Sequence, residues 1–122
     1  MSGYSKQGIL VKAERLSKED PDSAAKVIRA WLRRAWGPWK AAMVLLMLST
    51  TTAAGIFRKL GSGEAERLLS EVARLEGSVP GMRERALTEF HRLMLARIFI
   101  NQGGADYARA ALRAALGTAG AG

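Results

Sequence analysis

The residues with the most reactive side chains in this sequence do not form a catalytic set. His91 is the only histidine among 122 residues, and there is no cysteine. A metal site or a histidine-activated nucleophile needs several such groups together, and no spacing here supplies them. Glu84 and Glu89 fall on different faces of a predicted helix, where Arg85 and Arg92 are the expected partners of Glu89. The pattern therefore predicts no enzyme, no metal site and no cofactor.

Two further patterns have uses in ligand binding, but each has a simpler explanation. Gly103 and Gly104 precede a predicted helix, which can bind a phosphate through its free N–H groups. No strand precedes them and the lysine of a phosphate loop is missing, so we expect a helix break. Trp31, Trp36 and Trp39 lie among basic residues, as on a stacking platform for single-stranded nucleic acid. Because Trp31 and Trp39 fit apolar helix faces, packing is the simpler interpretation.

The composition is that of a globular protein with excess positive charge. Hydrophobic residues make up 48% of the chain, and 19 basic against 11 acidic residues give a net charge of +8. The excess is spread along the chain, so we interpret it mainly as solvated helix surface, with an acidic protein or an anionic membrane surface as the alternative. The longest uncharged run, 41–57, has 17 residues. A membrane-spanning helix needs about 20, so we expect a chain on the cytosolic side.

Every segment with clear hydrophobic periodicity has the period of a helix. Asp20 followed by Pro21 predicts a capped helix start, Ser49 to Thr52 offers caps for another, and Ser62 for a third. The final helix is expected to turn Tyr107, Ala111 and Leu112 inward. The expected helices are 8–18, 21–35, 39–48, 49–60, 64–76, 80–102 (opened by Pro80) and 106–116. The predicted fold is all-α: a compact, armadillo-like stack of about seven short helices, with an N-terminal two-helix segment docked on the bundle.

Docking is expected because both parts have apolar surface that needs a partner. The first two helices present an apolar stripe, and the helix over 39–48 is apolar on nearly every side. The predicted docking residues are Ile9, Ala13, Leu16, Ala24, Val27, Ile28, Trp31 and Leu32. The predicted groove residues are Met43, Val44, Met47, Phe57, Leu60, Leu68, Val72 and Phe90, of which Met43, Val44, Met47 and Phe57 are the first choices.

A series of motifs runs from residue 38 to residue 117. They are Pro38-Trp39-Lys40-Ala41-Ala42 before an aliphatic run, Ile56–Leu60, the segment Glu66–Leu75, the pair Glu89-Phe90, and GGADYARAALRAALG from Gly103 to Gly117. In these motifs the chain resembles the N-terminal domain of the flagellar motor switch protein FliG. Ser49 to Thr52 departs from the family, which commonly has a glycine followed by acidic residues there.

Residues 9–32 carry a different set of motifs, namely Asp20-Pro21, Ala25, Val27-Ile28-Arg29 and Trp31-Leu32. They resemble the cytoplasmic C-terminal tail of the MS-ring protein FliF, the family's docking segment for the FliG N-terminal domain. The two resemblances imply a docking segment (1–34), a FliG-like domain (35–117) and a flexible tail (118–122).

The resemblances imply a structural module of the bacterial flagellar rotor. It would anchor the motor switch complex, the C ring, to the MS ring through FliF–FliG co-folding and so transmit torque for motility. The expected location is the basal body at the cytoplasmic face of the inner membrane, with membrane contact only through the MS ring. The expected partner is the FliF-like tail, in cis or in a neighbouring chain, with no nucleic acid and no small-molecule substrate. FliG proteins continue beyond this region, so we expect the rotor–stator and chemotaxis-protein contacts to be missing.

Several alternatives stay open at this point. The join between the two segments can be natural or engineered, and copies of the chain can form a homo-oligomer or a ring. The competing functions are a basic all-α regulatory or nucleic-acid-binding domain, and an armadillo-like regulatory domain of a magnesium transporter.

We predict that a peptide of residues 9–32 is largely unfolded alone and becomes helical when residues 35–122 are added. Within the peptide the two expected helices are cut to 9–18 and 21–32, which is at or below the about 12–15 residues that an isolated helix needs. Circular dichroism of the peptide, with and without the remaining chain, measures this. A peptide that is stably helical and does not bind would refute the prediction.

Overall fold

The computed structural model describes residues 6–75 and 81–121, and these residues confirm the all-α prediction. They contain seven α-helices, one π-helical turn and no strand. Pro80 lies outside the described residues, and the sixth helix begins at Met82. The elements are α1 (Lys6–Glu19), α2 (Pro21–Leu32), α3 (Gly37–Met47), α4 (Thr50–Arg58), α5 (Ser62–Arg74), α6 (Met82–Phe99), the π-helical turn η2 (Ile100–Gly104) and α7 (Ala105–Ala121).

Two of the three predicted helix caps are confirmed, and one is wrong. Asp20 accepts a hydrogen bond from the Ser23 backbone N–H at 3.0 Å and begins α2, and Ser49 begins α4 by accepting from the Thr52 N–H. For α5 we expected Ser62, but the cap is Gly61, which has extended backbone angles. Glu64 makes the difference, because its carboxylate reaches back and accepts the Gly61 N–H at 2.9 Å.

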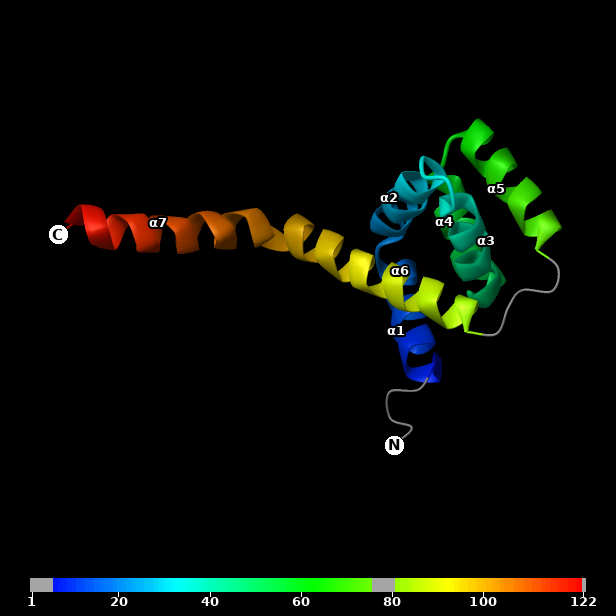
Figure 1. The fold of residues 1–122 in the computed structure, drawn as a ribbon, viewed down its shortest axis with the longest axis horizontal. Coiled ribbons are helices and arrows are strands. Elements are labelled where there is room, and N and C mark those ends of the chain that lie inside the picture. Colours follow the sequence, from blue (N-terminus) through cyan, green and yellow to red (C-terminus); the bar gives the residue numbers. More distant parts are fainter. Residues whose placement is uncertain (1–5, 76–80, 122) are drawn as a thin grey trace.

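Helices α1 to α6 surround one hydrophobic core (Figure 1). We call α1 and α2 the N-terminal pair (residues 6–32) and α3 to α6 the body (residues 37–99). Helix α2 packs against α3, α4 and α6, whereas α1 packs against α6 and α4. Helix α5 lies mainly on α3, on the side away from α1. The N-terminal pair is therefore part of the same packed unit as the body.

The end of the chain differs from the prediction. We expected Gly103-Gly104 to break the chain before a short helix with Tyr107, Ala111 and Leu112 inward. Instead α7 continues from α6 through η2 and projects from the body (Figure 1), with all three side chains exposed. The helix also runs to Ala121, beyond the predicted end at Leu116 and into the predicted tail 118–122. "Compact" therefore describes α1 to α6 but not α7.

The two glycines allow a widened helical turn in place of a reversal. Gly103 has a φ of +103°, which favours glycine. A Cβ on Gly104 would lie 2.5 Å from the Phe99 carbonyl oxygen, so only glycine fits against that turn. The rings of Phe99 and Tyr107 meet edge-on across η2, with centroids 6.1 Å apart.

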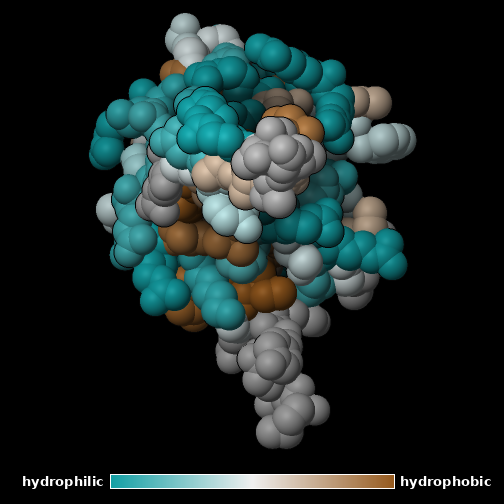
Figure 2. Space-filling view, turned by 90° about the vertical axis from the view of Figure 1, so that its left-hand side faces the viewer, coloured by the Kyte–Doolittle hydropathy of each residue, from teal (hydrophilic) through white to brown (hydrophobic). Residues whose placement is uncertain are grey.

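The exposed surface of this end is partly apolar. Large hydrophobic side chains are exposed on α6, η2 and α7, namely Leu95, Phe99, Ile100, Tyr107, Leu112 and Leu116. Figure 2 looks at the molecule from the side on which α7 projects and shows apolar side chains gathered near the middle, among hydrophilic ones. Across the described ranges, no helix combines the length and the hydropathy that crossing a bilayer requires.

Candidate docking interface

The structure brings the sixteen predicted docking and groove residues to one hydrophobic core. From the N-terminal pair, the buried ones are Ala13, Ala24, Val27, Ile28, Trp31 and Leu32, with Ile9 and Leu16 partly buried against them. From the body, the buried ones are Met43, Val44, Leu68 and Phe90, with Met47, Phe57, Leu60 and Val72 partly buried against them. Their burial is a finding, whereas their role in binding a partner stays a prediction.

Trp31 is the largest buried side chain of this interface. It is 2% exposed, and its ring centroid lies 6.1 Å from that of Phe90, with the two rings tilted by 53°. Such aromatic pairs add to the free energy of burial. Lys40 lies over the indole, with Nζ 5.9 Å from the ring centroid. Phe90 was among the predicted groove residues but not among the first choices, so α6 contributes more to the Trp31 site than expected.

Glu89 has a different partner from the one we expected. Its carboxylate accepts a hydrogen bond from Lys40 Nζ at 2.9 Å, which joins α3 to α6. The expected pairing with Arg85 and Arg92 used only neighbours on the same helix. Because α3 packs on α6, Lys40 comes within reach of Glu89, and the same contact holds the Lys40 ammonium next to the Trp31 ring.

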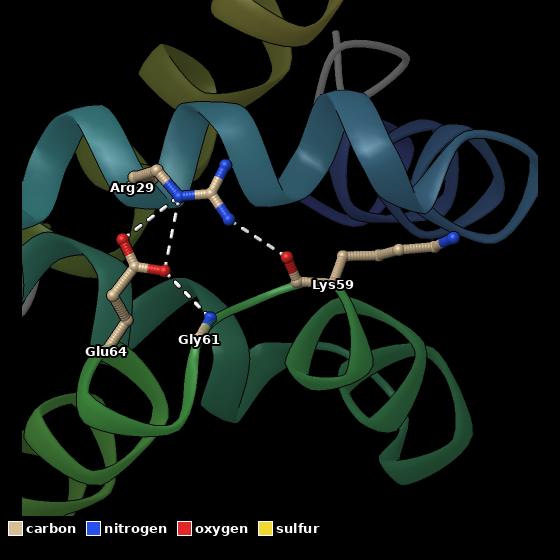
Figure 3. Close-up of polar contacts among 4 residues, drawn as sticks. All are labelled: Arg29, Lys59, Gly61 and Glu64. Carbon is tan, nitrogen blue, oxygen red and sulfur yellow. Dashed lines mark hydrogen bonds and ion pairs between the residues drawn. The ribbon is translucent and has the colours of Figure 1, made fainter.

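Arg29 ties α2 to the corner between α4 and α5 (Figure 3). Its Nε donates to both carboxylate oxygens of Glu64, at 3.0 and 3.2 Å, and its Nη2 donates to the Lys59 carbonyl at 2.9 Å. Glu64 also accepts the Gly61 N–H, and this backbone hydrogen bond, followed by Arg29, lowers the pKa of Glu64. Nearby, Lys59 Nζ lies 3.8 Å from Asp22 of α2. The polar face of α2 is thus fixed to the body at this corner.

Glu14 makes a second polar connection, between α1 and the start of α4. One carboxylate oxygen accepts the Ser49 N–H at 2.9 Å, and the other accepts the hydroxyls of Ser49, at 2.6 Å, and of Thr52. Partial burial raises the pKa of Glu14, but the hydrogen bonds from Ser49 and Thr52 outweigh it and lower the pKa overall. A carboxylate at a helix N-terminus also interacts favourably with the helix dipole.

Sequence reasoning missed both polar connections. Arg29 and Glu64 are 35 residues apart, as are Glu14 and Ser49. Arg29 lies off the apolar stripe of α2 and Glu64 lies in the first turn of α5, and neither position by itself indicates the partner. The sequence did contain one signal for the second connection. The capping segment 49–52 has no acidic residue, and the predicted first helix carries Glu14, which could bond its free N–H groups.

The remaining reactive residues do not converge. His91 is partly buried, and this burial, together with the Lys12 charge, lowers its pKa. Trp36 is 76% exposed, and Trp39 packs against the core. In 6–75 and 81–121, no three histidine or acidic side chains lie close enough together to hold a metal ion. The contacts described above hold α1 and α2 in a fixed orientation on the body.

Comparison with known proteins relates the chain to flagellar motor switch proteins. The family model of the FliG N-terminal domain matches residues 34–122. The chain is 39% identical over 82 residues to the flagellar motor switch protein FliG of Borreliella burgdorferi, which covers 67% of this chain and 24% of the relative. It is 33% identical over 81 residues to the proteins of the same name from Bacillus subtilis and Thermotoga maritima, which covers 66% of this chain and 24% of each relative. No solved structure matches.

These matches show that the chain is a helical domain of the flagellar motor switch protein class. The chain belongs to the FliG N-terminal domain family. It spans about a quarter of the length of the curated relatives that it matches. The family match begins at residue 34, so α1 and α2 lie outside it. The comparisons favour neither the nucleic-acid-binding nor the magnesium-transporter alternative.

Removing the Trp31 side chain should loosen the N-terminal pair from the body. We expect Trp31→Ala to lower the free energy of unfolding by roughly 3–5 kcal/mol, because a buried indole is lost and a cavity is left. Arg34→Ala, at an exposed position, should change it by no more than about 0.5 kcal/mol. Chemical denaturation measures both variants, with amide exchange in residues 41–60 as the local readout. Unchanged exchange in 41–60 of Trp31→Ala would show that the docking face is wrong.

Acid should weaken the two polar connections. The pKa values of Glu14 and Glu64 are lowered from the usual 4.5, so their stabilisation is complete above pH 4.5 and is lost as the pH falls through the folded values. We expect the free energy of unfolding to decrease below about pH 4.5, and to decrease less in Glu14→Gln/Glu64→Gln. Glu66→Gln, at an exposed position of α5, is the control. If the double variant had the same acid dependence as the control, the connections would not contribute.

Proposed function

We propose that this chain is a FliG N-terminal domain joined to its own MS-ring docking segment. In this proposal the N-terminal pair acts as the FliF-like tail, and the body together with α7 acts as the FliG-like part. The module anchors the switch complex to the MS ring at the cytoplasmic face of the inner membrane. Torque then passes through the contact between the N-terminal pair and the body.

The observation that carries the proposal is the core shared by the two parts. Of the nineteen buried hydrophobic residues in the described ranges, seven come from the N-terminal pair and twelve from the body. Ile28 and Trp31 are 0% and 2% exposed. Fully burying a side chain of this kind contributes about 1.5–3 kcal/mol before its ordering entropy is subtracted. The docked side chains of the pair are therefore buried as completely as the core side chains of the body.

Transmitting torque also requires that the two parts do not slide or rotate against each other. Apolar contacts are non-directional, and they set an orientation only through shape. Arg29 of α2 bonds the Lys59 carbonyl at the end of α4 and Glu64 in α5, whereas Glu14 of α1 bonds Ser49 at the start of α4. Together they fix both the rotation and the register of the pair. A docked segment held by apolar burial alone would lack this fixed rotation and register.

The order of the two resemblances supports the same assignment. The segment resembling an MS-ring tail precedes the family match, and the structure packs it on the matched part of its own chain. The relatives are named as flagellar motor switch proteins, which agrees with a role of this chain in the motor.

Motility of a flagellated host tests the proposal most specifically. The host's MS-ring protein is given residues 6–34 as its tail, and its FliG is given residues 35–121 as its N-terminal domain, so that only docking connects them. We expect swimming in soft agar with the unchanged sequence and with Arg33→Ala. We expect its loss with Ile28→Asp, because a charge replaces a fully buried side chain. Swimming with Ile28→Asp at normal protein levels would contradict the proposal.

A further inference from the structure

The connection between α2 and α3 is a tight reversal of four residues, 33–36. It is held by backbone hydrogen bonds from the Arg34 N–H to the Trp31 carbonyl at 3.0 Å, and from the Gly37 N–H to the Arg34 carbonyl at 3.2 Å. This reversal places α2 directly on α3 of the same chain. It is therefore the part of the structure that decides on which chain the N-terminal pair docks.

Gly37 makes the reversal possible because its backbone lies against that of Trp31. A Cβ at position 37 would lie 1.5 Å from the Trp31 carbonyl oxygen and 2.4 Å from the carbonyl carbon. These are backbone atoms, and they cannot move aside as a flexible side chain can. The Trp31 indole is packed on Phe90, so a shift of the Trp31 backbone would also pull the ring out of its site.

A side chain at position 37 would oppose the reversal but would leave the docking surfaces unchanged. The apolar stripe of α2 would still need to be buried, and the body would still present the same surface for it. A second copy of the chain presents that surface as well. An opened connection of four residues spans up to about 13–14 Å, which allows the pair to reach a neighbouring body.

We propose that Gly37 keeps the N-terminal pair on its own chain, and that the partner of the pair, once this turn opens, is a second copy of this chain. The exchange is reciprocal: each pair docks on the other body, and every contact of the interface forms between chains. Only the turn differs between the two forms, as in domain-swapped dimers. In the unchanged chain the short connection gives the pair an effective concentration on the order of millimolar, which favours the monomer. The inference rests on the docking that the proposed function assumes, and not on the flagellar role.

The test compares Gly37→Ala with Gly63→Ala, since a Cβ on Gly63 meets no atom within 4 Å. Each variant, and the unchanged chain, is unfolded and refolded as an equal mixture of ¹⁴N- and ¹⁵N-labelled protein. Light scattering after size exclusion gives the mass. A carbodiimide then joins Asp22 to Lys59, which are 3.8 Å apart and exposed, and mass spectrometry shows whether the linked peptides carry one isotope or both.

We expect monomers with single-isotope Asp22–Lys59 links for the unchanged chain and for Gly63→Ala. We expect a doubled mass and mixed-isotope links for Gly37→Ala. A folded, monomeric Gly37→Ala with single-isotope links would overturn the proposal, as would mixed-isotope links in the unchanged chain. Absence of the link from the unchanged chain would instead contradict the docking itself.

If Gly37→Ala does not fold, a second variant tests whether Gly37 acts through the turn. Inserting Gly-Ser-Gly-Ser between Arg34 and Ala35 in Gly37→Ala lengthens the turn and removes the need for close approach. We then expect a folded protein with the Asp22–Lys59 link restored. If this variant also fails to fold, Gly37 is needed for something other than the turn, and the proposal is wrong.

Discussion

The burial of one face of α2 between α3 and α6 is the interaction on which the rest of the structure depends. Trp31 packs on Phe90, and Ile28 and Val27 are almost completely removed from water. A 12-residue helix such as α2 would be marginal in isolation, so its folded state requires this surface. The body in turn would expose its most apolar helix, α3, without it. Each part therefore stabilises the fold of the other.

The polar contacts at the edge of this interface have a different role. Arg29 and Glu64 are each about one-third exposed, so solvent screens their attraction and their contribution to stability is modest. Their geometry is specific, however, because Arg29 bonds a carboxylate and a backbone carbonyl together. Glu14 likewise bonds only where the start of α4 meets α1. The hydrophobic face supplies most of the stability, and the polar contacts fix the orientation.

The sequence predicted features that depend on local chemistry. Asp20 and Ser49 begin helices because their side chains bond the next turn, and the stripe through Val27 and Trp31 is buried because its spacing puts it on one face. The polar connections were not predictable in the same way, since Arg29 reaches a partner 35 residues away that only the tertiary fold selects.

The direction of α7 was mispredicted for a related reason. Two adjacent glycines permit either a reversal or a widened helical turn, and composition alone does not distinguish these. The structure takes the widened turn, in which Gly104 lies against the Phe99 carbonyl. A reversal would have turned Tyr107, Ala111 and Leu112 inward, whereas in the projecting helix all three are exposed.

The central claim is that the N-terminal pair and the body form one cooperative unit. Native-state amide exchange of the intact chain at increasing denaturant tests it directly, because it gives the free energy of the opening that exposes each amide. Amides of residues 24–32 in α2 and 41–47 in α3 should exchange through the same opening, with equal free energies and equal denaturant dependence. Exchange of the α2 amides through a separate opening of lower free energy, with α3 still protected, would contradict the claim.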